Sequence, residues 1–167
     1  GVYEDVATII LNLKGVVIKN HTNGPKTLHL NATEEGEVTA GDIESDPDVE
    51  IINKDKVIAT LSKGGKLNME IVVTNGRGYV DSEINKKLLD IKKPGVIAID
   101  SSYSPIERVN IAVEDARVGQ ATNYDKLILE VWTNGAMKPE EAIALASRII
   151  IEHFEILTEL NSIADIK

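Results

Sequence analysis

The chain has 167 residues, 43% of them hydrophobic, and a formal net charge of −9 at pH 7. It is long enough to bury a core and lies between one domain and two small ones. The negative charge argues against binding nucleic acid unaided, because phosphate binding needs a concentrated basic face. It has no cysteine, which excludes disulfides and thiolate metal sites and fits a cytoplasmic protein, and no apolar run approaches the ~18 residues of a membrane span.

Residues 3–14 are predicted to form a helix. Five apolar residues fall on one face of it: Val2, Val6, Ile9, Ile10 and Leu13. Glu4 and Asp5 would lie in the first turn, where the positive end of the helix dipole favours acids. Lys14 followed by Gly15 would end the helix, since glycine is the usual residue just after a helix.

Between residues 16 and 80 the hydrophobic period changes to two, which is typical of strands. The apolar segments are VVIK, TLHL, VEII, VIATL and MEIVV, separated by the turn clusters Asn23-Gly24-Pro25, Glu35-Gly36, Asp46-Pro47 and Gly64-Gly65. Short strands at this spacing predict a compact, mostly antiparallel β domain. Because the chain has one Phe, one Trp and four Tyr, its core must be built from Ile, Val and Leu.

Residues 81–95 interrupt the strand pattern. They are polar, rich in lysine and end in Pro-Gly, so we expect an exposed loop or lid there. Strands are expected to resume at residues 96–99.

A second unit is predicted to begin near Pro105. Two segments show the alternation of half-buried strands, with apolar positions at Val109, Ile111 and Val113 and then at Leu127, Leu129 and Val131. Asn134-Gly135 marks the turn out of the second strand. Pro139 and the acids after it then open a helix that should run to about residue 160.

The order of these elements predicts the α+β class, with two domains. Residues 1–104 would form a β-rich domain with a leading helix. Residues 105–167 would hold two long strands and the helix over residues 139–160.

The long helix carries more apolar surface than one docking contact requires. One row comprises Ile143, Ala146, Ile150, His153, Leu157 and Leu160, close to a heptad seam. A second row comprises Ala142, Ile149, Phe154 and Ile156. The helix is either buried within its own domain or wide enough to serve both its own sheet and a partner helix, and periodicity does not decide between the two.

No catalytic constellation is found in the sequence, and no metal site or cofactor is expected. The segment Asp46-Pro47-Asp48-Val49-Glu50 lacks the glycine and the later glutamate of a calcium loop, so we interpret it as a solvated turn. Gly76-Arg77-Gly78-Tyr79 matches no phosphate-binding loop, and close backbone packing or a bulge explains its glycines better. The histidines show no metal-ligand spacing.

Collinear blocks along the chain resemble one known family. They include GVYEDVATIILNLKGVVIK, VTAGDI, DVEIIN, VIATLSKGGKLNMEIVV, GRGYV, RVNIAVEDARVGQATNYDKLILEVWTNG and PEEAIALASRIIIEHFEIL. In this order they are similar to the amino-terminal, assembly half of the bacterial RNA polymerase α subunit. The resemblance covers residues 1 to about 160, and it is weak over residues 81–93, which leaves any activator contact there in doubt.

The resemblance implies a non-catalytic scaffold for DNA-directed RNA polymerase. In the family a β-rich insert domain interrupts a dimerisation domain, and the α dimer is the platform for the large β and β′ subunits. The implied dimer residues are Ile143, Ala146, Ile150, His153 and Leu157. The implied large-subunit contacts are Arg117, Asp125 and Lys126, on the segment 114–126, together with Arg77 and Tyr79 of the insert domain.

The resemblance also implies that this chain is a fragment. Family members have a strand and a first helix before the segment matched here, and a linker and promoter-binding domain after it. The long helix, lacking that first helix, is expected to leave apolar surface uncovered and to self-associate. Two alternatives stay open: a free-standing ligand-binding β module, which would need a deep pocket, and a small hydrolase, which would need two facing acids with perturbed pKa values.

Overall fold

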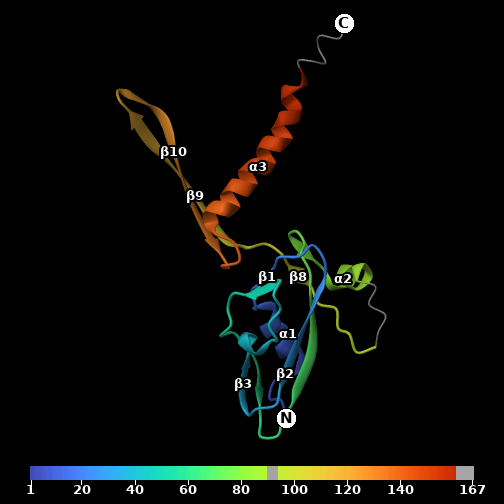
Figure 1. The fold of residues 1–167 in the computed structure, drawn as a ribbon. Helices are drawn as coiled ribbons and strands as arrows, with labels where there is room; N and C mark the ends of the chain where they lie inside the picture. Colours follow the sequence, from blue (N-terminus) through green and yellow to red (C-terminus); the bar gives the residue numbers. More distant parts are fainter. Residues whose placement is uncertain (90–93, 161–167) are drawn as a thin grey trace. The chain divides into compact units, whose positions relative to one another are not determined.

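The computed structural model describes residues 1–89 and 94–160 (Figure 1). The chain divides into two compact units, Gly1–Ser104 and Pro105–Lys167. Helices occur in both units, and every named strand pair is antiparallel. The predicted α+β class is therefore confirmed.

Helix α1 (Val6–Lys14) is shorter than the predicted helix over residues 3–14. Asp5 is the N-cap, and its carboxylate accepts a hydrogen bond from the Thr8 backbone N–H at 2.7 Å. Glu4 lies before the helix and accepts hydrogen bonds from the backbone N–H and the hydroxyl of Thr60, at 2.7 and 2.9 Å. The prediction was wrong at the start of the helix because these two acids cap it and tether it instead of extending it.

The strands of the first unit form two-stranded antiparallel ladders. The pairs are β1 (Ile18–Asn20) with β4 (Val49–Ile51), β2 (Lys26–Ala32) with β6 (Leu67–Val73), β3 (Gly36–Thr39) with β5 (Val57–Leu61), and β7 (Tyr79–Val80) with β8 (Ser101–Ser102). All five predicted segments of residues 16–80 contribute to a strand. The short β3 and the 3-10 turn η1 (Ala40–Asp42) were not predicted, since neither carries enough alternation to be noticed.

The core of the first unit is aliphatic, as the composition required. Its buried residues are Leu28, Leu30, Val38, Ala40, Ile43, Ile58, Ala59 and Leu61. Strands β2 and β5 supply most of them, at alternate positions in β2, and α1 packs on this cluster through Ile9 and Leu13. Asn12 fixes the helix by donating a hydrogen bond to the carbonyl of Ile58 at 2.9 Å.

The predicted loop over residues 81–95 is wrong in its first half. Residues Ser82–Leu88 form helix α2, capped by Asp81, whose carboxylate accepts from the Glu83 backbone N–H at 2.9 Å. Asn85 is buried and donates to the Ile99 carbonyl at 2.8 Å and to the Ser101 hydroxyl at 2.9 Å. The predicted strand over residues 96–99 is also wrong, because pairing begins only at β8. Residues 90–93 of the predicted loop lie outside the described residues.

The second unit consists of a long hairpin and a helix (Figure 1). Strands β9 (Ile106–Val118) and β10 (Ala121–Thr133) pair over most of their length, and Gly119 turns between them with a φ of 65°. A positive φ suits the tight turns that join such strands. Helix α3 (Pro139–Thr158) follows and ends close to the predicted residue 160.

The hairpin differs from prediction in its burial. The register places Leu127 opposite Val113 and Leu129 opposite Ile111, so the predicted apolar positions do share one face. That face is open: Ile111 is 64% exposed, Val113 62% and Leu127 63%. The prediction of half-buried strands is wrong at these positions because nothing within the described part of the second unit covers them.

Candidate assembly surfaces

Helix α3 presents its apolar residues to solvent. No residue of this helix is buried, and the three apolar positions of the implied dimer face, Ile143, Ile150 and Leu157, are 39%, 58% and 54% exposed. Seven residues separate each of them from the next, so they lie on one face of the helix. Helix α3 is therefore not buried within the described part of its own unit. That interpretation, one of the two that periodicity left open, is wrong.

The polar and small members of the same row also lie on this face. Ala146 and His153 are exposed, and the His153 Nδ1–H donates to the Ile149 carbonyl one turn earlier at 2.8 Å. Phe154 lies four residues after Ile150 and is 62% exposed. Residues four apart are neighbours on a helix, so Phe154 belongs with Ile150 and its predicted place in the second row is wrong.

The hairpin carries a second apolar surface. Val109, Ile111, Val113, Leu127 and Leu129 are 40% to 64% exposed. On the opposite face Arg108 lies over the Trp132 ring, with its guanidinium carbon 4.6 Å from the ring centre. This stacking covers one face of the tryptophan, whereas the aliphatic residues are left uncovered.

The predicted large-subunit contacts of the second unit gather toward the tip of the hairpin. Lys126 lies opposite Glu114 in the ladder, with 3.9 Å between Nζ and the carboxylate, and both side chains are more than half exposed. Asp125 lies directly opposite Asp115, an arrangement of like charges that destabilises an antiparallel pair. Arg117 turns its Nε toward the carbonyl of Gly119, at 3.0 Å.

The predicted contacts of the first unit are both exposed: Arg77 lies two residues before β7, and Tyr79 is its first residue. Tyr79 is held by Asp100, whose carboxylate accepts its hydroxyl hydrogen bond at 2.9 Å and also pairs with Lys14. The Lys14 ammonium and then the Tyr79 hydroxyl lower the pKa of Asp100, and the same hydrogen bond from the hydroxyl raises the pKa of Tyr79.

The glycines beside Arg77 have a packing role, as interpreted from the sequence. A Cβ built on Gly76 would lie 2.5 Å from the Tyr103 ring, so only glycine fits there. The Tyr103 hydroxyl lies 2.6 Å from the Thr74 hydroxyl, and Gly78 has a φ of 63°. The segment around Arg77 is therefore shaped by contact with Tyr103 and not by a phosphate.

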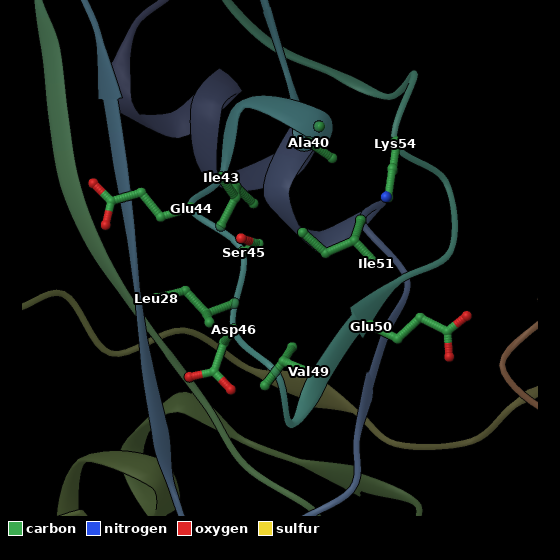
Figure 2. A pocket seen from close by; sticks show the side chains of 11 residues that line it. Leu28, Ala40, Ile43, Glu44, Ser45, Asp46, Val49, Glu50, Ile51 and Lys54 are labelled. Carbon is green, nitrogen blue, oxygen red and sulfur yellow. The ribbon is translucent and has the colours of Figure 1, made fainter.

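A hollow of the first unit, lined by residues between Leu28 and Lys54, does not support the ligand-binding alternative (Figure 2). Its volume is about 190 Å³, below the ~300 Å³ at which small-molecule sites usually begin. Its apolar floor includes Ile43, Val49 and Ile51, whereas the Glu44 and Glu50 side chains point outward on opposite sides. These two carboxylates therefore do not converge on it.

The hydrolase alternative also lacks support. Within residues 1–89 and 94–160 the carboxyl groups with a shifted pKa are Glu4, Asp5 and Asp100, and hydrogen bonds lower the pKa of each. A general acid at neutral pH needs a raised pKa instead. Among the described residues there is no cluster of three or more potential metal ligands, and none of the described helices is both long and apolar enough to cross a membrane.

The geometry thus describes an α+β protein with one packed β-rich unit and one unit whose apolar faces lie open. A family model described as the RNA polymerase Rpb3/RpoA insert domain matches residues 1–104, and the chain belongs to this family. The resemblance drawn from the sequence is confirmed.

Curated relatives extend the match beyond the first unit. The chain is 55% identical over 165 residues to the DNA-directed RNA polymerase subunit alpha of Symbiobacterium thermophilum, covering 99% of this chain and 52% of that protein. It is 52% identical over 166 residues to the subunit of the same name from Clostridium botulinum strain Hall, with the same two shares. The corresponding protein of Moorella thermoacetica is 50% identical over 161 residues, which cover 96% of this chain and 51% of that protein. The chain spans about half the length of the curated relatives it matches.

The roles of three residues important to these surfaces were not predicted from the sequence. Asn85 anchors α2, Tyr103 shapes the Arg77 segment, and Trp132 stacks with Arg108. Each acts through a residue distant in sequence or on a paired strand, and local patterns carry no such signal.

Proposed function

We propose that this chain is the dimerising assembly part of an α subunit of DNA-directed RNA polymerase. The observation that carries the proposal is the uncovered apolar face of α3, together with the family and the curated relatives of the same name. A face of this kind rarely stays open to water in a soluble protein. In this role the chain has no catalytic site and acts in the cytoplasm.

The α3 face fits a second copy of the same helix. A twofold dimer places one patch against itself, and an apolar row repeating every seven residues packs well against its own copy. Ile143, Ile150 and Leu157 would lie at the centre of this contact, with Ala146 allowing close approach and His153 at its edge. This contact would make residues 105–167 the remainder of the dimerisation domain.

The dimer proposal is tested by a pair of adjacent isoleucines on α3. Ile150 and Ile151 are 58% and 57% exposed, but they lie about 100° apart around the helix. Ile150→Asp should convert a self-associating chain to monomer in sedimentation experiments, because it buries a charge in the contact. Ile151→Asp, equally exposed, should leave association unchanged. A monomeric unmodified chain at high concentration, or equal effects of both variants, would contradict the proposal.

The charged tip of the hairpin fits the rim of a contact with a large subunit, β or β′. The Asp115 and Asp125 pair is unfavourable in the isolated hairpin, and Lys126 is weakly paired. Cationic groups on a partner would reduce the repulsion between Asp115 and Asp125, and acidic groups on the partner would pair with Lys126 and Arg117. Arg77 and Tyr79 form the corresponding contact on the insert domain. Residues 1–104 are the insert domain in this proposal, and no residue binds nucleic acid directly.

Charge reversal tests the large-subunit contact in the full-length protein that contains this chain. Arg117→Glu and Lys126→Glu should each weaken capture of a large subunit by ~1–3 kcal/mol without unfolding the protein. Lys63→Glu reverses an exposed charge on the first unit at a residue that is not among the proposed contacts, and it should have no effect. Unchanged capture of both large subunits by both hairpin variants would place the contact elsewhere.

A further inference from the structure

The chain contains the triplet Thr-Asn-Gly three times, at residues 22–24, 74–76 and 133–135. An asparagine followed by glycine is the sequence most prone to spontaneous deamidation, because glycine has no Cβ to hinder attack by its backbone nitrogen. Asparagine is accordingly among the residues that thermostable proteins reduce. The three copies share their local sequence but differ in structure. Comparing their asparagines therefore separates the effect of structure on deamidation from the effect of local sequence.

At residues 74–76 the side chain of the asparagine is tied down. The Asn75 amide donates hydrogen bonds to the carbonyls of Asn20 and Thr22, at 3.3 and 2.6 Å. Gly76 in turn packs its backbone against the Tyr103 ring. The carboxamide carbon of Asn75 therefore cannot swing over the Gly76 nitrogen without breaking these contacts.

At residues 133–135 both reacting groups are engaged. The Asn134 side-chain oxygen accepts a hydrogen bond from the Ala136 backbone N–H at 3.0 Å. The Gly135 N–H, which must lose its proton before attack, donates to the Thr133 hydroxyl at 3.4 Å. These contacts are weaker than those of Asn75, so this site should be intermediate.

At residues 22–24 the reacting groups are free. Asn23 is exposed, and within residues 1–89 and 94–160 neither its side chain nor the Gly24 N–H makes a hydrogen bond. The turn around them is held through other atoms: the Asn20 amide and the Thr22 hydroxyl both donate to the Gly24 carbonyl, each at 3.2 Å. The carboxamide of Asn23 can thus rotate while the turn keeps Gly24 beside it.

We infer that Asn23 is a site of spontaneous deamidation, with water as the only co-reactant. The Gly24 nitrogen attacks Cγ of Asn23, a C–N bond forms, and the Cγ–Nδ2 bond breaks. Ammonia leaves with the proton from the Gly24 N–H. Water then opens the cyclic imide at either carbonyl, giving aspartate or isoaspartate.

The product changes the turn between β1 and β2. Either product adds a negative charge to a chain that already carries −9. Isoaspartate also routes the main chain through the side-chain carbon, which displaces the Gly24 carbonyl from its two donors. Since Asn75 is tied to Thr22 in the same turn, the effect would reach the segment before Arg77.

The test follows all three asparagines at once in the full-length protein that contains this chain. After incubation at neutral to mildly alkaline pH, peptide mapping by mass spectrometry measures loss of each Asn-Gly and separates aspartate from isoaspartate. In the native protein Asn23 should react about tenfold or more faster than Asn75, which must wait for local opening. In urea the three rates should converge.

Gly24→Ala is the matched variant. A Cβ on Gly24 would meet nothing within 4 Å, so the fold tolerates it, but it hinders attack on Asn23. This variant should suppress the reaction at Asn23 and leave that at Asn134 unchanged. The inference is overturned if Asn23 reacts no faster than Asn75 and Asn134 in the native protein. It is equally overturned if the advantage of Asn23 persists in urea, because local sequence would then be the cause.

Discussion

The two units of this chain use apolar residues in opposite ways. In its described part, the first unit encloses eight hydrophobic residues in a core between its strands and α1. In the second unit none of the described residues is buried, although its strands and helix carry as regular an apolar pattern. Hydrophobic burial drives both folding and association. Covering the open apolar faces of the second unit with another surface would therefore be favourable.

The second unit is held together mainly by its backbone. Two strands of 13 residues exchange main-chain hydrogen bonds, and α3 satisfies its own. An isolated two-stranded hairpin is only marginally stable in water. The comparison therefore teaches that the first unit carries its stability within itself, whereas the second is expected to gain most of its stability from a partner.

The largest expected effect comes from truncating one leucine in each unit. Leu30 is 0% exposed, and Leu30→Ala should lower the free energy of unfolding of the first unit by ~3 kcal/mol, through lost burial and a residual cavity. Leu129 on β10 is 40% exposed, and Leu129→Ala should cost less than ~1 kcal/mol in the unassociated chain. Urea unfolding measures both. Equal costs would break the contrast between a packed unit and an open one.

Much of the first unit was predictable because local pattern and burial agree there. The segment TLHL alternates in sequence, and β2 buries Leu28 and Leu30 while Thr27 and His29 are exposed. The failures lie where a polar side chain makes a long-range contact. Asp81 and Glu83 give α2 an ordinary helix start, but the hydrogen bonds of Asn85 to Ile99 and Ser101 that anchor the helix leave no local signal.

For the second unit the elements were predictable and the burial was not. The alternation of Ile111 and Val113 gave the strand and its face, since a period of two requires only backbone geometry. Whether that face is buried depends on which other residues pack against it. The same alternation occurs in strands that face a core and in strands that face a protein interface. The candidate residues Ile150, Arg117 and Tyr79 rest on the resemblance to the family and stay predictions.

A smaller effect is expected at Gly76, where the first unit is packed even at its surface. Gly76→Ala would drive a Cβ to 2.5 Å from the Tyr103 ring and should destabilise the unit by ~1–3 kcal/mol. Gly24→Ala is the control, since its Cβ has open space, and it should change stability by less than ~0.5 kcal/mol. Thermal unfolding measures both. If Gly76→Ala left the free energy of unfolding unchanged, Tyr103 would have to move aside freely. The close packing of the first unit would then not extend to the segment before β7.

The smallest expected effect is electrostatic and depends on pH. Asp100 joins α1 to β7 through Lys14 and Tyr79, and the Lys14 ammonium followed by the Tyr79 hydroxyl lowers its pKa. A carboxyl group with a lowered pKa in the folded state contributes stability above its unfolded pKa of about 4, and this contribution is lost as pH falls through the folded value.

Asp100→Asn should therefore be less stable than the unmodified chain at pH 7, and the difference should shrink below pH 4 as Asp100 becomes protonated. Tyr79→Phe should reproduce part of the loss at pH 7, because it removes one of the two donors.

At the alkaline end the raised pKa of Tyr79 has the opposite sign: its contribution is present below its unfolded pKa of about 10 and is lost as pH rises through the folded value. Glu35→Gln, which removes an exposed carboxylate from a turn of the first unit, controls for the change in net charge. Urea midpoints measured from acid to alkaline pH decide the matter, and a pH-independent gap between Asp100→Asn and the unmodified chain would show that Asp100 acts by shape and not by charge.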